Sequence, residues 1–232
     1  MNIFYLSRSY LIAKNFWLLL APNDLCCDWT MGSIPLITSL ADPRNLSTII
    51  FIVSFFNVVF VGLFRRGGDV VLLSVALISI PFLPASNLFF PVGFVIAERV
   101  LYIPSMGFCL LVAFGYSRLC QKKIFNRKLL NCFIVFLISV HSAKTILRNF
   151  DWKDESSIFL SGLRVNVNNA KLWNNVGHAL EGQSRYDEAL KYFSVAAQVQ
   201  PDDVGAHINV GRTLNNLGKF DEAEKVYLVR NF

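Results

Sequence analysis

The apolar and polar positions divide the chain into two parts that meet near residue 150. Before that point, long apolar runs alternate with short basic clusters, and beyond it charged and amide side chains become frequent. The clearest run, residues 46–64, has 19 residues and would extend about 28 Å as a helix, which matches the hydrocarbon core of a bilayer. The same pattern predicts four membrane-crossing helices, over about 46–64, 70–90, 101–120 and 129–147.

The N-terminal segment is apolar as well, but it is a weaker candidate for a span. Residues 1–20 include Arg8 and Lys14, which excludes a clean signal-peptide core. Because these charges recur with a nearly helical spacing, we expect a partial or interfacial helix. The next residues, 21–35, are rich in turn formers and are predicted to be a loop, with Trp29 as an anchor at the membrane interface.

A proline-rich apolar segment, Pro81–Gly107, stands at the centre of the first part. Its four prolines each remove a backbone donor and interrupt a helix; they are Pro81, Pro84, Pro91 and Pro104. Backbone groups freed in this way do not face lipid, so we expect the segment to be buried in protein, re-entrant, or at a water-facing surface. The adjacent pair Glu98-Arg99 lies inside it. Ionisable residues in a broken apolar helix indicate a functional site, and the alternative is that the pair marks a helix end at the interface.

The polar part repeats itself with a period of 34 residues, which is typical of the tetratricopeptide repeat. The first unit has Trp173, Gly177, Ala189, Phe193 and Pro201, and the second has His207, Gly211, Ala223 and Tyr227 at the matching positions. We expect the small residues to let two helices approach, the aromatic residues to fill the space around them, and Pro201 to end a helix. One full repeat is predicted over 170–203 and an incomplete one over 204–232, after a linker and degenerate repeat helix at 151–169. The fold class predicted from both parts is all-α.

Composition supports a membrane protein with a polar tail. Hydrophobic residues make up 54% of the chain and the mean hydropathy is +0.46, well above the level of soluble proteins. The net charge of +6 is no indication of nucleic-acid binding, because much of the basic excess lies between apolar runs. Since such clusters stay in the cytosol, Arg65-Arg66 and the 118–128 loop predict that both chain ends are lumenal. Asn45 then begins a lumenal glycosylation sequon beside the membrane.

Familiar catalytic and metal-binding patterns do not appear. No nucleophile triad, phosphate-cradling glycine loop or metal-ligand cluster is found, and the cysteines have no CxxC spacing. Asp24 and Asp28 would share a helical face, but the turn residues around them favour solvated loop positions. His141, inside the last predicted span, is interpreted as a hydrogen-bonded packing residue rather than a proton relay.

The run FLPASNLFFPVGFVIAERVLYIPSMGFCLL, preceded by DWTMGSIPLI and followed by tetratricopeptide repeats, closely resembles the transmembrane and tetratricopeptide-repeat-containing O-mannosyltransferases. The resemblance covers almost the whole chain. It implies that residues 1–150 form a partial transmembrane glycosyltransferase domain of the C type, in the endoplasmic-reticulum membrane with lumenal repeats. It also implies transfer of mannose from the lipid-linked donor dolichyl-phosphate-mannose to Ser or Thr of proteins, cadherin-like acceptors among them, without a further cofactor or metal.

The resemblance also shows what to expect of the site residues. The family's acidic catalytic motif lies in a lumenal loop that the resemblance places upstream of Met1, so the catalytic residue is unknown and the chain resembles a middle portion of such an enzyme. The candidates for binding the donor phosphate are Arg99, which has the charge and forked donors for it, and its neighbour Glu98, which would orient Arg99 or be neutralised by it. The rival interpretation is a non-catalytic membrane adaptor whose repeats grip a partner segment.

Overall fold

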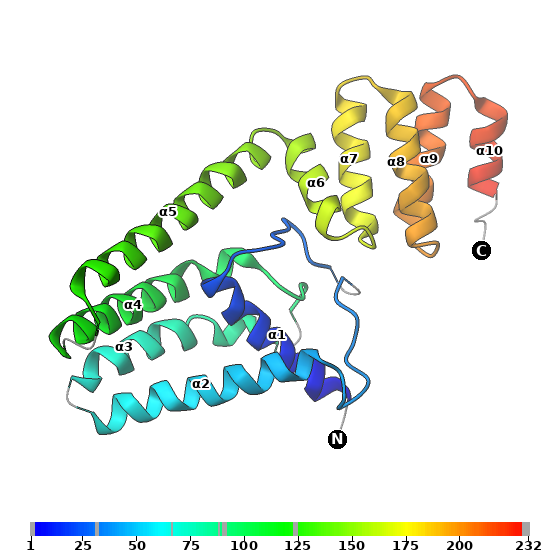
Figure 1. Ribbon diagram of the computed structural model, residues 1–232. Coiled ribbons are helices and arrows are strands. Elements are labelled where there is room, and N and C mark those ends of the chain that lie inside the picture. Colours follow the sequence, from blue (N-terminus) through cyan, green and yellow to red (C-terminus); the bar gives the residue numbers. More distant parts are fainter. Residues whose placement is uncertain are drawn as a thin grey trace. The chain divides into compact units, whose positions relative to one another are not determined.

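The computed structural model describes residues 3–30, 33–65, 67–87, 89, 92–122 and 125–228. These residues form α-helices and two short 3₁₀ helices, η1 and η2, so the predicted all-α fold is confirmed (Figure 1). In chain order the elements are α1 (Ile3–Leu20), α2 (Arg44–Phe64), α3 (Gly68–Ser79), η1 (Leu83–Ala85), η2 (Glu98–Leu101), α4 (Tyr102–Lys122), α5 (Arg127–Asp151), α6 (Glu155–Val165), α7 (Ala170–Gly182), α8 (Tyr186–Val199), α9 (Val204–Asn216) and α10 (Phe220–Leu228).

The chain folds as two compact units. The first, here called the membrane unit, comprises Met1–Asn23 and Ile34–Thr145, and the second, the repeat unit, comprises Asp24–Ser33 and Ile146–Phe232. The domain ranges drawn from the sequence stay predictions. What the structure adds is that ten residues of the loop between α1 and α2 belong to the repeat unit.

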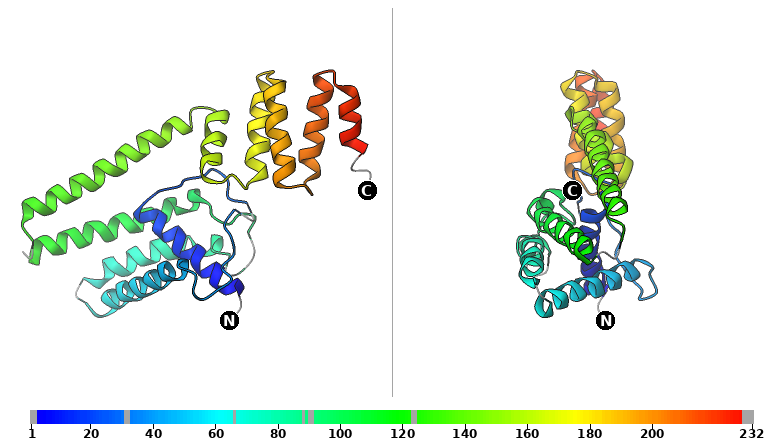
Figure 2. Two further views of the ribbon diagram at one scale, coloured as in Figure 1. Left: turned by 45° about the vertical axis from the view of Figure 1, so that its right-hand side comes forward. Right: turned by 60° about the vertical axis from the view of Figure 1, so that its left-hand side comes forward.

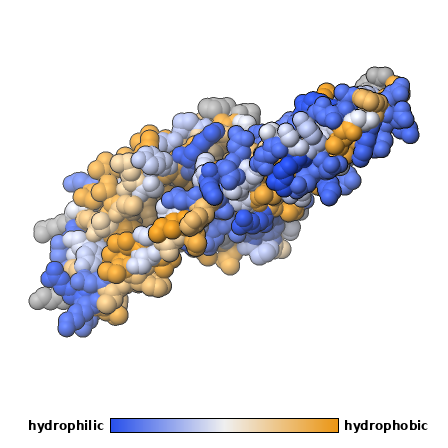
Figure 3. All heavy atoms as spheres, turned by 90° about the horizontal axis from the view of Figure 1, so that it is seen from above, coloured by the Kyte–Doolittle hydropathy of each residue, from blue (hydrophilic) through white to orange (hydrophobic). Residues whose placement is uncertain are grey.

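Four helical segments are long and apolar enough to cross a bilayer: Arg44–Phe64, Gly68–Ala85, Glu98–Lys122 and Arg127–Asp151. They correspond to the four predicted spans, although α3 itself ends at Ser79 and is continued by turns and η1. Much of their apolar surface is exposed, as expected for helices that face lipid. In the space-filling view, hydrophobic residues gather over the membrane unit, whereas the visible face of the repeat unit is largely hydrophilic (Figure 3).

Within the membrane unit, α3 packs against both α2 and α4, and α1 packs against α2. A glycine explains how closely α3 and α4 approach. A Cβ atom added at Gly107 of α4 would lie 2.5 Å from the backbone oxygen of Ser74 in α3, so a larger residue would force the two helices apart. Small residues at such contacts are a common way of packing helices in membranes.

The repeat unit is a row of antiparallel helices from α6 to α10, in which each helix packs against the next and α7 also contacts α9 (Figure 2). Phe193 of α8 is fully buried and lies against Gly177 of α7, where an added Cβ atom would come within 2.5 Å of the Phe193 ring. Gly211 of α9 has the same relation to Tyr227 of α10, also at 2.5 Å. The repeat therefore recurs as a glycine-to-aromatic contact between paired helices.

Trp173 is placed differently from a core residue. It is only half-buried: its indole N–H donates to the backbone oxygen of Val167 at 2.7 Å, and its ring lies 5.7 Å from that of Tyr192. The neighbouring Leu172 is fully buried instead. Trp173 thus connects the residues before α7 with α8.

The loop segment Asp24–Ser33 is held by α6, α7 and the residues between them. Asp28 forms an ion pair with Lys171 (Oδ2–Nζ 2.5 Å) and its backbone oxygen accepts from the Asn169 side chain at 3.0 Å. Asn166 donates to the Ser33 hydroxyl at 2.7 Å. The Cys26 thiol, which is buried, lies 3.8 Å from the Gly162 backbone oxygen. The repeat unit is therefore built from two separate stretches of the chain.

This arrangement corrects one prediction and agrees with another. Trp29 is only 5% exposed, and its segment belongs to the repeat unit, so it is a buried residue and not an anchor exposed at the membrane interface. Sequence reasoning missed this because a lone tryptophan in a turn-rich stretch carries no information about its distant partners. Asp24, with a φ of 52°, and Asp28 both lie in irregular structure rather than on a helix, as the turn residues predicted.

Candidate functional site

The described part of the membrane unit contains an apolar cavity of about 250 Å³. Its walls come from α1, α2, the end of α3 and the turn after it, η2 and the start of α4. The lining residues are Ile12, Asn15, Phe16, Leu19, Phe51, Ile52, Phe55, Phe56, Ile78, Ser79, Phe82, Leu83, Ser86, Leu101 and Pro104.

Helical spacing and the prolines explain this cavity. Ile12, Phe16 and Leu19 recur on one face of α1, and Phe51 and Phe55 do the same on α2, because residues three or four apart lie above one another on a helix. The chain leaves regular α-helix after Ser79, which allows the turn that contains Phe82 to close the end of the cavity. The end of this candidate span thus also forms part of the cavity wall.

One polar residue stands out in the apolar wall. Asn15 is only 5% exposed, and its Nδ2 donates to the backbone oxygen of Leu11 at 2.8 Å, within α1. Its Oδ1 is buried and accepts no hydrogen bond from the residues that the structure describes. A buried acceptor without a donor typically costs about 1–3 kcal/mol. Sequence reasoning passed over Asn15, because a single amide in an apolar helix does not reveal whether its two polar atoms are paired.

Glu98 and Arg99, the predicted donor-site pair, are the first two residues of η2. Arg99 is exposed and makes no hydrogen bond or ion pair with the described residues, whereas Glu98 is half-buried and does have a partner. The two side chains form no ion pair with each other, so neither orients or neutralises the other directly. Leu101, at the end of the same short helix, lies in the wall of the cavity. η2 therefore carries an available guanidinium next to an apolar recess.

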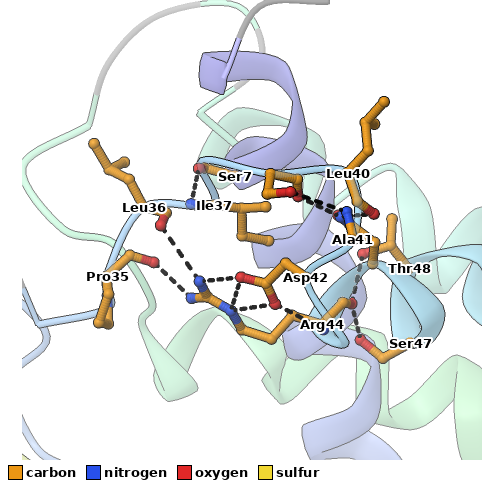
Figure 4. A network of polar contacts seen from close by, with 12 residues as sticks. Ser7, Pro35, Leu36, Ile37, Leu40, Ala41, Asp42, Arg44, Ser47 and Thr48 are labelled. Carbon is orange, nitrogen blue, oxygen red and sulfur yellow. Dashed lines mark hydrogen bonds and ion pairs between the residues drawn. The ribbon is translucent and has the colours of Figure 1, made fainter.

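A network around Arg44 fixes the loop that leads into α2 (Figure 4). The guanidinium forms a two-point contact with Asp42, with Nη2–Oδ2 at 2.7 Å and Nε–Oδ1 at 3.0 Å, and it also donates to the backbone oxygen of Pro35 at 2.6 Å. The hydrogen bonds from Arg44 hold the pKa of Asp42 below its usual value. On the other side of the loop, the backbone N–H of Ile37 donates to the Ser7 hydroxyl of α1 at 2.9 Å. These contacts attach the loop to α1 on one side and to the first residue of α2 on the other. They thereby help to position the two helices that line the cavity.

The Asn45 sequon lies inside this network. The Asn45 side-chain amide donates to the backbone oxygens of Ser39 and Leu40, both at 3.0 Å, and Asn45 itself belongs to the first turn of α2. The Ser47 hydroxyl donates to the Arg44 backbone oxygen at 2.7 Å. Both groups that define the sequon are thus engaged within the fold.

The repeat unit carries a polar row that the sequence did not reveal. It runs between α7 and α9, where Asn209 donates to the Asn174 side chain at 3.2 Å and Arg212 makes a two-point contact with Glu181 at 2.8 and 3.2 Å. His178 lies 3.4 Å from the same Glu181 carboxylate. Corresponding helices of consecutive repeats are thereby joined side by side.

His141, on α5, does not contribute to the cavity or to this row. Its Nδ1 lies 3.0 Å from the backbone oxygen of Leu137, one turn earlier in the same helix. This contact agrees with the expected hydrogen bond of the ring, and the packing role of His141 stays a prediction.

Known proteins match both units of this chain. The family described as Protein O-mannosyl-transferase TMTC, DUF1736, matches residues 3–56, and the tetratricopeptide repeat family matches residues 180–229. Protein O-mannosyl-transferase TMTC3 of Homo sapiens is 55% identical over 97% of the chain, and its counterpart in Drosophila melanogaster is 48% identical over 96%. Protein O-mannosyl-transferase TMTC2 of Homo sapiens is 36% identical over 78% of the chain.

The chain spans about a quarter of the length of these relatives: 25%, 24% and 28% respectively. Its match to them runs through the membrane helices and into the repeats. The chain therefore belongs to the TMTC family, whose curated members carry the name protein O-mannosyl-transferase.

Proposed function

We propose that this chain supplies the lipid-donor site of a protein O-mannosyltransferase that takes mannose from dolichyl-phosphate-mannose and transfers it to Ser or Thr of secretory-pathway proteins, cadherin-like ones among them. The observation that carries this proposal is the exposed Arg99 on η2, beside an apolar recess in a unit with membrane-spanning helices. The names of the relatives support the reaction class. The enzyme would lie in the endoplasmic-reticulum membrane with its repeats in the lumen.

The chemistry of the donor explains why an arginine is suited to this place. A dolichyl phosphate enters from the bilayer and presents anionic phosphate oxygens at its surface. The planar guanidinium offers two parallel N–H donors to such oxygens. During transfer, the electron pair of the bond between mannose C1 and the phosphate oxygen passes to the phosphate, whose growing charge Arg99 would stabilise. The proton of the acceptor hydroxyl goes to a general base, which is not assigned to any residue of this chain.

Glu98 has a different part in this proposal. A carboxylate would repel the donor phosphate, and Glu98 is half-buried with a partner of its own. We therefore assign the phosphate contact to Arg99 alone, with Glu98 helping to hold η2 in place.

Replacing Arg99 by alanine should weaken binding of dolichyl-phosphate-mannose by roughly ten- to hundredfold. A hydrogen bond to a charged group contributes about 1.5–3 kcal/mol, and each 1.4 kcal/mol is a factor of ten in affinity. Arg99→Lys keeps the charge but loses the two-point contact of the guanidinium, so its affinity for the donor should lie between those of the parent and of Arg99→Ala. The measurement is a titration of the purified chain in lipid nanodiscs with a photoreactive dolichyl-phosphate-mannose.

Arg127→Ala is the matched control, because this exposed arginine follows the far end of α4 and should leave donor binding unchanged. Thermal unfolding of each variant shows whether the fold is intact. A folded Arg99→Ala protein that binds the donor as tightly as the parent would rule out the phosphate contact.

A second function, a membrane adaptor whose repeats bind a protein segment, is favoured by the polar row between α7 and α9. Half-exposed amide and charged groups, such as those of Asn209 and Arg212, are suited to contact a polypeptide. The donor titration separates the two functions. An adaptor has no need of the lipid-linked sugar, so the parent chain would then show no saturable binding of it.

The proposed orientation predicts which engineered sequon is glycosylated. Gly182→Asn creates a sequon with Gln183 and Ser184, at an exposed site where an added Cβ meets no atom within 4 Å. If the repeats are lumenal, this site should be modified in microsomes, which is read as an endoglycosidase-sensitive shift on a gel. Asn45 should stay unmodified in the folded chain, because its amide is engaged.

A second variant tests the opposite side of the membrane. It carries a short linker with a sequon, inserted between Phe125 and Asn126 in the loop assigned to the cytosol. We expect no glycan there. Modification of this linker together with an unmodified Gly182→Asn site would show the reverse orientation.

A further inference from the structure

Two adjacent thiols lie together against one helix of the repeat unit. Cys26 and Cys27 are both reduced, and each places its sulfur close to a backbone oxygen of α6. The Cys26 Sγ lies 3.8 Å from the Gly162 oxygen, and the Cys27 Sγ lies 3.8 Å from the Ile158 oxygen. These two oxygens are about one helical turn apart. The thiols therefore occupy neighbouring positions on the same side of α6.

The two sulfurs also contact each other. In an extended segment, successive side chains point to opposite sides. The chain bends at Cys27, however, and both sulfurs face α6. The Cys26 thiol donates to the Asp28 backbone oxygen at 3.2 Å, and its side chain forms a hydrogen bond with the Cys27 thiol. Two thiols in hydrogen-bonding contact are placed to form a bond with each other after a small movement.

Cys27 is the thiol that a reagent in solution meets first. It is half-buried, whereas Cys26 is only 2% exposed. The hydrogen bond with the Cys26 side chain lowers the pKa of Cys27, against the opposing effects of burial and of the Asp28 carboxylate. The positive charge of Arg148 lowers this pKa as well. Since the thiolate is the form that attacks a disulfide, Cys27 is suited to react first and Cys26 second.

We propose that Cys26 and Cys27 are a redox pair, which a disulfide of the glutathione class oxidises to a disulfide bond between the two adjacent residues. The Cys27 thiolate attacks one sulfur of glutathione disulfide and displaces a glutathione thiolate. Cys26 then gives up its proton and attacks the Cys27 sulfur, which displaces the second glutathione. The cysteines lose two electrons and two protons in total, and the two glutathione thiols gain them.

The spacing of adjacent residues makes this bond reversible. Neighbouring Cα atoms are about 3.8 Å apart, whereas the Cα atoms of a disulfide are usually about 4.4–6.8 Å apart. A strained disulfide is more easily reduced, and strained disulfides are typically labile or regulatory rather than structural. The pair should therefore follow the ratio of oxidised to reduced glutathione. This chemistry is independent of the mannose donor and of Arg99.

Oxidation changes how the segment Asp24–Ser33 is held. A disulfide has no S–H group, so the two sulfurs no longer donate to the backbone oxygens of Ile158 and Gly162. The contacts of Asp28 with Asn169 and Lys171 do not involve the thiols and should remain. The segment should therefore loosen next to α6 without leaving the repeat unit.

The test uses the complete chain in detergent, equilibrated in buffers with different ratios of oxidised to reduced glutathione. The remaining thiols are alkylated and the chain is digested with trypsin. The tryptic peptide 15–44 contains Cys26 and Cys27 and no other cysteine. In excess oxidised glutathione, we expect this peptide to carry no alkyl group and to be lighter than the reduced peptide by two hydrogen atoms. Dithiothreitol should restore both thiols.

Single substitutions separate the roles of the two thiols. Cys26→Ser lacks the second attacking group, so Cys27 should keep a bound glutathione. In Cys27→Ser, the buried Cys26 should take up glutathione about tenfold more slowly or less, because its sulfur becomes accessible only when the segment opens. Cys132→Ser is the matched control, since Cys132 is an exposed residue of α5, and its peptide 15–44 should be oxidised as in the parent.

Amide hydrogen exchange measures the effect on the segment. On oxidation, the amides of residues 24–33 should exchange roughly tenfold faster in the parent, as expected for the loss of two weak hydrogen bonds. In the double variant Cys26→Ser and Cys27→Ser, exchange should not depend on the glutathione ratio.

Three results would overturn the redox pair. The first is a peptide 15–44 that is doubly alkylated at every glutathione ratio, which would show that the thiols do not react. The second is a parent chain that keeps glutathione on Cys27 with Cys26 alkylated, which would show that the two sulfurs do not join. The third is an oxidised pair with unchanged exchange of residues 24–33, which would show that the bond does not act on the segment.

Discussion

Phe193→Ala is expected to lower the free energy of unfolding of the repeat unit by about 3–5 kcal/mol. Phe193 is fully buried, it lies directly against Gly177, and its ring centroid is 5.0 Å from that of His178. The residue that faces Phe193 on α7 is Gly177, which has no side chain to move into the space that the ring leaves. A cavity should therefore remain between α7 and α8. In a short repeat array, few neighbouring repeats contribute packing that would offset this loss of stability.

Amide hydrogen exchange of the complete chain in detergent would measure this effect on α7 and α8 separately from the membrane helices. A loss of about 3 kcal/mol corresponds to roughly hundredfold faster exchange of amides that open with the unit. Phe220→Ala is the matched control, because Phe220 is 65% exposed on α10 and should change exchange very little. If the amides of α7 and α8 exchange as slowly in Phe193→Ala as in the parent, the proposed packing is contradicted.

Trp29→Ala is expected to release the segment Asp24–Ser33 from its packed position, again at a cost of about 3–5 kcal/mol. Trp29 is the large apolar side chain of this segment and is 5% exposed. Its loss should leave the Asp28–Lys171 ion pair, which is largely solvent-accessible on the lysine side, too weak to hold the segment alone.

The buried thiol of Cys26 reports this detachment. Cys26 is 2% exposed, so its alkylation requires the segment to open, and the rate should rise about hundredfold or more in Trp29→Ala. The measurement is best made in a Cys27→Ser background, because Cys27 is only half-buried and a hydrogen bond with the Cys26 side chain lowers its pKa, so that its alkylation would accompany that of Cys26. Peptide mass spectrometry distinguishes Cys26 from the other cysteines.

Trp152→Ala serves as the control for this experiment, since Trp152 is in the same unit but 61% exposed. It should leave Cys26 protected. Slow alkylation of Cys26 in Trp29→Ala would mean that the polar contacts of the segment, and not Trp29, hold it in place.

Local and periodic features of this protein could be read from its sequence. The apolar runs around residues 46–64 and 129–147 correspond to α2 and α5, because helix length and hydrophobicity are properties of a continuous stretch. The 34-residue period likewise predicted that the contact of Gly177 with Phe193 would recur 34 residues later, as it does between Gly211 and Tyr227.

Contacts between distant stretches could not be read in this way. Nothing near Trp29 in the sequence indicates that Asn166 and Lys171, more than 130 residues later, would bind its neighbours Ser33 and Asp28. The same limit applies to Asn15, because whether an amide oxygen finds a donor depends on every element packed around it. Arg99 was recognisable because a charge inside an interrupted apolar helix is conspicuous by itself, but its exposure and its separation from Glu98 required the structure.

A cryo-EM map of the protein in a lipid nanodisc, with saturating dolichyl-phosphate-mannose and a bound antibody fragment to aid alignment, tests most directly whether Arg99 holds the donor phosphate. We expect phosphate density within hydrogen-bonding distance of the Arg99 guanidinium, at the first turn of η2. Donor phosphate bound at another place, with the Arg99 side chain still facing solvent, would contradict the proposed site.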